Sequence, residues 1–327
     1  MSPLFGRRRG AGQSPEEQAE EARRDAESLA RLEQGGIPLA ASERLAALGA
    51  EGAEAPFSSD LSVSEYALLH RLGVEPITMV MGSSIYHVGW QNVYFNSPTE
   101  FHAVSDAYNE ARRLALGRLV EEAQTAGADA VVGVRVTEGA YDWAASTVEF
   151  MAIGTAVRLP AELRGSAGPV LSDLSGQEYW QLCDAGIRPL GVAAFTSVHY
   201  APATMRTVAA QGGGMLGGGW RNQELTDYTQ ALYDARRTAM RGVAAQAAAV
   251  GADGVVGVRI RQHVRGQRVA RQMGVETEDI IVTMHVIGTA VRDDPALGHS
   301  GTAPKLALSL GSAPLPTAAT RAASAGP

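Results

Sequence analysis

The clearest pattern along the chain is an apolar stripe at helical spacing that occurs twice, 124 residues apart. Apolar or small residues recur every three or four positions, as they do on one buried face of an α-helix. Each stripe therefore predicts one long helix that packs on the rest of its domain. The two stripes are Phe101, Val104, Tyr108, Ala111, Ala115, Leu119 and Ala123, and Leu225, Tyr228, Leu232, Ala235, Ala239, Val243 and Ala247.

A nearly identical phrase follows each stripe, GADAVVGVRV from Gly127 and GADGVVGVRI from Gly251. Glycine just past the last helical turn readily takes the left-handed conformation that ends a helix. A short carboxylate in the turn can satisfy nearby backbone donors, which is the role expected of Asp129 and Asp253. The apolar, β-branched residues that come next predict a strand. The repeated phrase is therefore interpreted as a structural turn and not as a binding site.

Further landmarks complete the repeated unit. Capping boxes at Ser62–Glu65 and Ser175–Glu178 predict a short helix at the start of each copy. Apolar segments after Pro76 and Pro189 predict a first strand, and two segments that end in IGTAVR predict a last strand. The expected fold class is α+β, with two β-α-β-β domains in tandem, each with a helix on an antiparallel sheet and a short N-terminal helix.

Local signals also predict where the helices begin. The segment SPTE at 97–100 combines a capping box with proline at the first helical position, so the first long helix is expected to begin at Pro98. A similar segment, SPEE at 14–17, opens a helix expected to end before Gly35. The tail is rich in Ala, Pro, Ser, Thr and Gly, which predicts disorder. The expected organisation is an N-terminal helical or flexible segment (1–59), a first domain (60–160), a linker (161–172), a second domain (173–293) and a low-complexity tail (294–327).

These motifs resemble a known family. The chain has Ala111-Arg112-Arg113 in the long helix, the glycine phrase at 127–134 and Gly154–Val157 in the last strand, and all three recur at 235–237, 251–258 and 288–291. The combination resembles the YbjQ-like family, which is described as "putative heavy-metal-binding". The resemblance implies dodecin-like domains that form a homo-oligomeric ring, pentameric for single-domain members, and it implies no established reaction. A fused pair departs from the single-domain pattern and is compatible with a two-layer ring or a closed ring with an even number of units.

Composition narrows the class of function. The net charge of -7 argues against a dedicated nucleic-acid binder, although it allows a local basic patch. The single cysteine, Cys183, excludes an internal disulfide and a zinc site built from several thiolates. No apolar run is long enough for a transmembrane segment, and no apolar run follows the basic N-terminus as in a secretory signal. A cytoplasmic protein is therefore expected.

Three histidines on predicted strands are the candidate metal ligands. His87 and His199 lie near the ends of the two first strands, and His285 lies within the last strand of the second copy. Imidazole favours a divalent transition metal such as zinc, copper or nickel, but a site needs three or four converging ligands. The alternative for each residue is a hydrogen-bonded histidine without a metal.

A basic hairpin is the other candidate site. Alternating residues share one face of an extended strand, which would place several cations side by side. Such a stripe could bind an anionic partner: nucleic-acid phosphates, a lipid surface or an acidic protein. The equivalent first-copy loop, 137–146, is acidic and aromatic, which favours a complementary contact between copies or subunits. The hairpin residues are Arg259, Arg261, His263, Arg265, Arg268 and Arg271.

The sequence offers little for catalysis. It contains no G-x-S-x-G nucleophile elbow, and Cys183 has no evident histidine partner. The favoured interpretation is a non-enzymatic, ring-forming protein that binds a metal ion or a small ligand. The alternative is an oligomeric scaffold that binds an anionic partner through the basic hairpin 259–271.

Overall fold

The computed structural model describes residues 14–49, 57–89, 97–140, 147–165, 168–210, 222–271 and 276–297. Most of the tail that was expected to be disordered, residues 298–327, lies outside this part of the chain.

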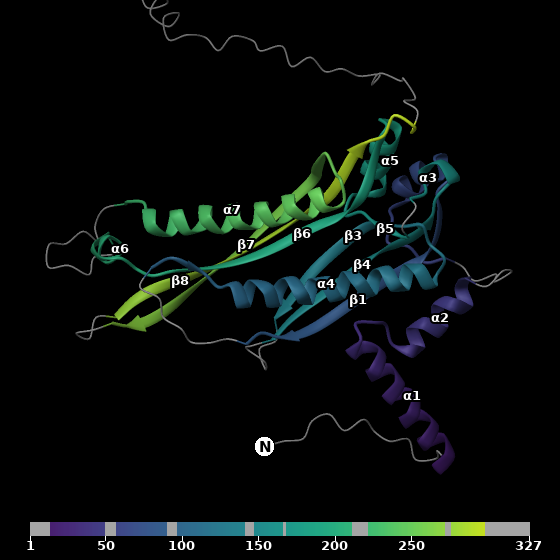
Figure 1. The fold of residues 1–327 in the computed structure, drawn as a ribbon, viewed down its shortest axis with the longest axis horizontal. Coiled ribbons are helices and arrows are strands. Elements are labelled where there is room, and N and C mark those ends of the chain that lie inside the picture. The colour runs from purple at the N-terminus through teal and green to yellow at the C-terminus, as the bar shows by residue number, and fades with distance from the viewer. Residues whose placement is uncertain are drawn as a thin grey trace, which may run out of the picture.

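Both repeats contain a three-stranded antiparallel core and one long helix (Figure 1). The first comprises α3 (Val63–Arg71), β1 (Glu75–His87), α4 (His102–Thr125), β3 (Ala130–Ala140) and β4 (Thr147–Arg158). The second comprises α5 (Gly176–Asp184), β6 (Ile187–Ala201), α7 (Thr226–Ala249), β7 (Gly254–Ala270) and β8 (Glu276–Asp293). The last strand of each repeat lies in the middle, with the orders β1-β4-β3 and β6-β8-β7. The predicted α+β class, with two copies of one unit, is confirmed.

The long helix of each repeat lies close to its sheet because a glycine removes one side chain at the contact. A Cβ atom on Gly82 in β1 would lie 2.0 Å from the carbonyl oxygen of Ala115 in α4. In the second repeat the strand residue is Phe195, and the space is made on the helix, where a Cβ on Gly242 would lie 2.2 Å from the Phe195 ring. Each repeat therefore forms its own core between one helix and one sheet.

The two glycine phrases form tight turns between helix and strand. Gly127 and Gly251 have φ values of 71° and 69°, in the left-handed region that suits glycine. The Asp129 carboxylate accepts a hydrogen bond from the backbone N–H of Leu159 at 2.9 Å, and Asp253 accepts one from Asp293 at 3.0 Å. These carboxylates therefore join the start of one strand to the end of its neighbour.

Each sheet gains a two-residue strand from the other repeat. β5 (Val170–Leu171) pairs in parallel with β3, and β2 (Thr99–Glu100) pairs in antiparallel with β6. The helix start predicted at Pro98 is therefore wrong: α4 begins at His102 because β6 holds the two preceding residues extended. The connection expected as a linker contains the 3-10 helix η1 (Ala161–Leu163) and ends in β5.

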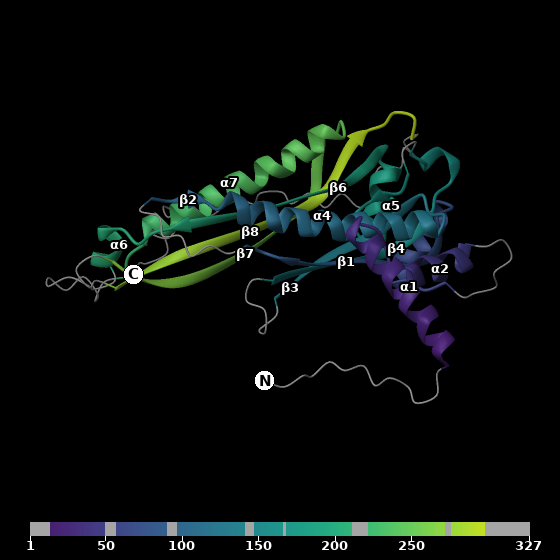
Figure 2. The same cartoon turned by 60° about the horizontal axis from the view of Figure 1, so that its bottom comes forward.

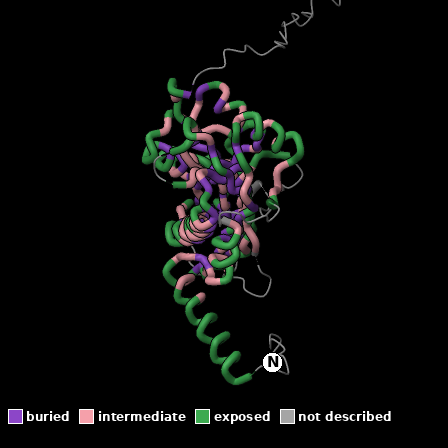
Figure 3. Tube along the Cα trace, turned by 90° about the vertical axis from the view of Figure 1, so that its right-hand side faces the viewer, coloured by how far each residue is buried: buried purple, intermediate pink, exposed green. Residues whose placement is uncertain are grey.

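Two helices precede the first repeat. α1 (Pro15–Glu33) begins with the predicted capping box at Ser14, buries none of its residues and projects from the body (Figure 3). α2 (Leu39–Gly49) packs on the first repeat, with Ile37 and Leu45 buried in the cluster that also contains Leu119 of α4. The short α6 (Met205–Ala210) follows β6. None of the described helices is long and apolar enough to cross a membrane.

A third apolar cluster joins the two repeats. The helix α4 contacts both β1 of its own repeat and β6 of the other (Figure 2). Side chains from α4, β4, β6 and β8 are buried together there, so the two repeats share a continuous interface. The buried members are Val88, Val104, Ala111, Ala115, Val148, Phe150, Val198, Tyr200 and Ile281.

Candidate metal centre

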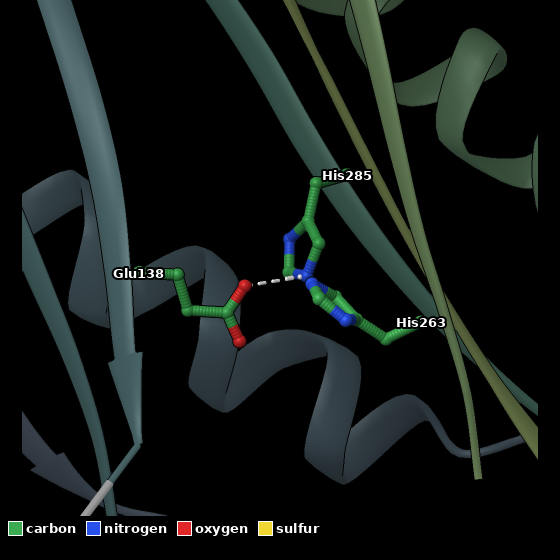
Figure 4. A group of neighbouring side chains, drawn as sticks. All are labelled: Glu138, His263 and His285. Carbon is green, nitrogen blue, oxygen red and sulfur yellow. Dashed lines mark ion pairs between the residues drawn. The ribbon is translucent and has the colours of Figure 1, made fainter.

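Three potential metal ligands meet where the two repeats join. Glu138 comes from β3 of the first repeat, and His263 and His285 come from β7 and β8 of the second (Figure 4). Their ligand atoms all lie within 4.8 Å of one another. His263 pairs with Thr283 across the β7–β8 ladder, so the two histidines are diagonal neighbours on one face of the sheet. The fold therefore brings a carboxylate from one repeat against an imidazole pair of the other.

The ring of His285 is held at one nitrogen and available at the other. Its Nδ1 atom lies 2.9 Å from the hydroxyl of Thr196. Its Nε2 atom is buried and 2.8 Å from the Glu138 carboxylate, yet no hydrogen bond of good geometry to Nε2 occurs among the described residues. The tautomer that donates its Nδ1 proton to Thr196 leaves the Nε2 lone pair directed toward the group, as metal ligation requires.

A buried arginine fixes the threonine that orients His285. Arg112 in α4 donates from Nη1 to the Thr196 hydroxyl at 2.5 Å and from Nη2 to the carbonyl oxygen of Ala194 at 2.9 Å. It also donates to the side-chain oxygen of Asn109. Burial lowers the pKa of Arg112 to about 10, against the opposing effect of the Glu138 charge. Arg112 therefore remains positively charged at neutral pH and forms a fixed layer behind the imidazole.

Aromatic side chains surround the same histidine. The Tyr108 and Phe150 ring centroids lie 5.7 Å and 6.4 Å from that of His285. Burial, reinforced by the Glu138 charge, raises the pKa of Tyr108 to about 12. The phenol is therefore neutral at physiological pH and packs against the ring, and it does not add an anionic ligand.

A cavity of about 130 Å³ opens beside the group, large enough for several water molecules or a small anion. Four arginines line it together with Glu138 and His285. Two of them form ion pairs, Arg135 with Asp60 at 2.5 Å and Arg259 with Asp173 at 2.9 Å. The other two are Arg112 and Arg261. The cavity therefore has positive charge that the neighbouring carboxylates balance only in part.

A larger hollow of about 680 Å³ lies elsewhere between the repeats and offers less chemistry. Its lining is mainly apolar and contains the lone cysteine, Cys183. Burial raises the pKa of the Cys183 thiol to about 11, so the thiol is protonated and unreactive at neutral pH. Arg188, also in the lining, is paired with Asp294 at 2.5 Å. This hollow gathers no set of converging ligands from the described residues.

The structure does not bring the three candidate histidines together. His87 is exposed at the end of β1. His199 is largely buried, and its Nε2 atom lies 4.0 Å from the Glu100 carboxylate without a hydrogen bond within the described chain. Burial lowers the pKa of His199, which favours a neutral ring. Of the three, only His285 belongs to the group of ligands that the described residues form.

The cationic side chains of the basic hairpin make several different contacts. Arg259 is paired with Asp173, and Arg271 binds the fully buried Asp279 through both carboxylate oxygens, at 2.8 and 2.9 Å. Arg261 lines the cavity, and His263 joins the metal group. Arg265 and Arg268 lie on the exposed part of β7. The hairpin therefore faces the first repeat along part of its length and does not present all of its cations as one surface stripe.

Sequence reasoning missed Glu138. The residue belongs to the acidic loop that was expected to complement the basic hairpin, and its carboxylate does contact the second repeat at His285. A glutamate on a strand has no motif of its own, however, and the sequence places His263 in the basic hairpin and His285 among the separate candidate metal ligands. Only the arrangement of β3 against β7 and β8 shows that the three side chains converge.

Comparisons with known proteins agree with the repeat. The family model YbjQ_1, described as "Putative heavy-metal-binding", matches residues 63–160 and 195–294, which together make up more than half of the chain. The encapsulin nanocompartment protein Rv1762c of Mycobacterium tuberculosis is 38% identical over 258 residues, covering 77% of this chain and 90% of that protein. A UPF0145 protein of Alkaliphilus metalliredigens is 40% identical over 91 residues, covering 26% of this chain and 85% of that protein. No solved structure matches. The chain therefore belongs to the YbjQ family and carries two copies of its domain.

Proposed function

We propose that the protein binds one divalent transition metal ion per chain through Glu138, His263 and His285, and that its role is binding and not catalysis. The observation that carries this proposal is the buried His285 Nε2 atom, which has no well-formed hydrogen bond within the described chain and lies within 4.8 Å of two further ligand atoms. Two imidazoles and one carboxylate suit zinc, nickel, cobalt or copper better than magnesium or calcium, which prefer oxygen ligands. The family description supports the same class of ion.

The surroundings of the group fit a metal ligand set. Metal-bound histidines usually donate their second ring N–H to a neighbour that fixes the ring, and Thr196, held by Arg112, is in that position. Three protein ligands leave at least one position on the ion for an exogenous group. The arginine-lined cavity is positively charged, which opposes a cation alone and stabilises an anion bound with it. Metal affinity is therefore expected to rise when a small anion such as phosphate is present.

A small oxyanion bound without a metal is the second candidate. The arginine lining of the 130 Å³ cavity supports it, since guanidinium groups bind oxyanions through paired hydrogen bonds. This candidate predicts phosphate binding to the metal-free protein that Arg261→Gln weakens and His263→Gln leaves unchanged. It replaces the scaffold interpretation of the hairpin, because Arg259 and Arg271 are engaged within the chain.

We further propose that the protein works as a cytoplasmic homo-oligomer of dodecin-like domains arranged in a ring. The name of the Mycobacterium tuberculosis relative extends this to association with an encapsulin nanocompartment. Co-expression of the full chain with an encapsulin shell protein tests that extension. Co-purification of the chain with assembled shells supports it, and complete separation of the two contradicts it.

The metal proposal is tested by titrating zinc and nickel into the chelator-treated full chain, with calorimetry and elemental analysis. We expect one ion per chain in the wild type and loss of at least tenfold in affinity in His285→Gln. The matched control is His87→Gln, which changes an exposed strand histidine outside the group. Equal affinity in the wild type and His285→Gln, or equal loss in both variants, contradicts the assignment.

A further inference from the structure

The joint between the two repeats has two components, and the first is a strand addition. The segment 170–174, at the start of the second repeat, lies along the free edge of β3. Val170 and Ser172 donate backbone hydrogen bonds to Asp129 and Val131 at 3.0 and 2.9 Å. Gly133 and Val134 donate back to Leu174 and Ser172 at 3.0 and 2.9 Å. The start of one repeat thus extends the sheet of the other.

The second component is the N-terminal half of α4 on the free edge of β6. The backbone N–H of Phe101 donates to Val198 at 2.8 Å, and the N–H of Val198 donates to the Ser105 hydroxyl at 2.9 Å. Two helical turns beyond Ser105, Arg112 donates to Ala194 and Thr196. Side chains of one helix thereby satisfy the edge of a strand that belongs to the other repeat.

Because the unit is duplicated, the elements that form each side of the internal joint have equivalents elsewhere in the chain, and these equivalents form two further surfaces. The equivalents of β3 and of the first half of α4 are β7 and the first half of α7; this surface is called the acceptor face. The equivalents of segment 170–174 and of the β6 edge are segment 57–61 and the β1 edge; this surface is called the donor face. The acceptor face belongs to the second repeat and the donor face to the first, so one chain carries one of each.

The donor segment already has the position that the joint requires. Asp60 accepts a hydrogen bond from Thr155 at 2.6 Å and is paired with Arg135. Asp173 makes the equivalent contacts with Thr289, at 2.5 Å, and Arg259. Segment 57–61 therefore lies on its own sheet as segment 170–174 does. It forms no strand in the described chain, however, and neither do residues 223–224, whereas their equivalents are β5 and β2.

Exposure separates the two outer faces from the internal joint. Val198 is 1% exposed in the joint, and its equivalent on β1, Ile85, is 60% exposed. Val134 is fully buried on β3, and Val258 is 38% exposed on β7. The chain thus leaves apolar side chains in water at the positions that the joint buries. The other exposed apolar residues on these faces are Phe57, Met79, Met81, Tyr233, Ile260 and Val264.

The charged residues show the same contrast. Arg112 is 5% exposed, and each of its hydrogen bonds lies at or near the joint. Its equivalent, Arg236 in α7, is exposed, and no ion pair or hydrogen bond from it occurs in the described part of the chain. The equivalent acceptors on the donor face are the carbonyl oxygen of Met81 and the hydroxyl of Ser83. A second copy of the chain fits these faces, because the internal joint already shows the hydrogen bonds that such a copy would make.

We infer that copies of this chain join head to tail, the acceptor face of one binding segment 57–61 and the β1 edge of the next. This inference rests on the proposed self-association and specifies its surfaces. Gly254 pairs with Phe57 of the next copy as Ala130 pairs with Val170, and Arg236 donates to Met81 and Ser83 of the next copy. Because every chain has one face of each kind, the contact repeats from copy to copy, and any ring that it closes contains an even number of repeats.

The joint between copies does not repeat the metal group. The equivalents of Glu138 and His285 are Gln262 and Met151, and the equivalent of His263 is Gly139. The new joint therefore lacks the carboxylate and both imidazoles. The assembly is expected to hold one metal ion per chain and not one per repeat.

The first test is the oligomeric state of the full chain by native mass spectrometry. The variant is Arg236→Glu, and the matched control is Arg237→Glu, the next residue on the same helix, which is exposed and paired with Asp234. We expect a discrete multimer for the wild type and Arg237→Glu, and at least a tenfold loss of multimer for Arg236→Glu. A monomeric wild type, or a multimer equally stable in both variants, overturns the inference.

The second test traps the strand pairing. The double variant Phe57→Cys with Gly254→Cys is expected to form disulfide-linked multimers on mild oxidation, because paired strand residues bring Cβ atoms within reach. The controls are the single variants Phe57→Cys and Gly254→Cys, which both retain the buried native Cys183. They are expected to form no ladder of disulfide-linked multimers. Absence of the ladder in the double variant overturns the pairing. Zinc titration of monomeric Arg236→Glu separates the proposals, since the metal group lies within one chain and is expected to bind there unchanged.

Discussion

Replacing Arg112 by methionine removes the guanidinium group from the interface between the repeats while keeping most of the apolar stem. Three acceptors then lose a charged donor: the Thr196 hydroxyl, the Ala194 carbonyl oxygen and the Asn109 side-chain oxygen. Each acceptor keeps one other donor, namely His285 Nδ1, the Gln246 side-chain amide or the Thr196 backbone N–H, so no acceptor is left without a hydrogen bond. A hydrogen bond to a charged group contributes about 1.5–3 kcal/mol, so losing the three costs about 6 kcal/mol. Bulk water cannot replace the lost hydrogen bonds, because Arg112 is only 5% exposed.

Removing the buried charge offsets part of this cost. Burial lowers the pKa of Arg112 from 12.5 to about 10, which corresponds to roughly 3 kcal/mol of unfavourable desolvation at about 1.4 kcal/mol per pH unit. The net expectation is a loss of about 3 kcal/mol in the free energy of unfolding. Arg113, the next residue, is exposed and paired with Glu110 at 2.6 Å, so Arg113→Met is expected to cost less than about 1 kcal/mol.

The assay is urea unfolding of both variants in the presence of a chelator, followed by far-ultraviolet circular dichroism. Arg112→Met is expected to unfold at clearly lower urea, and Arg113→Met close to the wild type. Metal affinity in Arg112→Met is also expected to fall, because Thr196 no longer holds the His285 ring in place. Stability of Arg112→Met within about 0.5 kcal/mol of the wild type refutes the account of this interface.

Three further predictions follow from single residues. Burial lowers the pKa of His199, so the neutral ring stabilises the fold above the ordinary histidine pKa of about 6.5, and this stability is lost as the pH falls through and below that value. When the pH is lowered from 7.5 to 5.5, the melting temperature of His199→Gln should therefore fall less than that of the wild type. Equal falls in thermal unfolding refute this prediction. Gly82→Ala should destabilise by more than about 3 kcal/mol because its Cβ meets the Ala115 carbonyl oxygen, whereas Gly117→Ala, in open space within α4, should stabilise by about 0.5–1 kcal/mol; urea unfolding tests both, and the same sign in both contradicts the packing. Arg261→Gln should abolish the increase in zinc affinity that phosphate produces, and an unchanged increase in calorimetry would exclude Arg261 from the anion site.

The repeated unit could be predicted from sequence because its signals are local. The helical stripes, the left-handed glycines and the capping boxes at Ser62 and Ser175 each depend on residues a few positions apart. Contacts within one repeat follow from these elements. The exchange of β2 and β5 does not, because Thr99 and Glu100 satisfy a helix signal locally and are held extended by β6. A tertiary contact overrides the local preference there.

The metal group could be predicted only in part for the same reason. His285 was recognised as a strand histidine, but its neighbours are decided by strand register. A shift of one residue in the β7–β8 ladder would turn His263 to the opposite face of the sheet. Glu138 approaches from the other repeat, and nothing in the sequence around it specifies that distance. The charges of the acidic loop and the basic hairpin predict that these two segments meet, but they do not predict which residues are in contact.

The most direct test of the central claim is a crystal structure of the full chain grown with zinc, with anomalous diffraction recorded on both sides of the zinc absorption edge. The account predicts one anomalous peak per chain, coordinated by Glu138, His263 and His285, with Thr196 retained at the Nδ1 atom of His285. A strong peak at another place, such as His199 with Glu100, or an undisturbed ion pair between His285 and Glu138 with no peak beside it, would contradict the assignment.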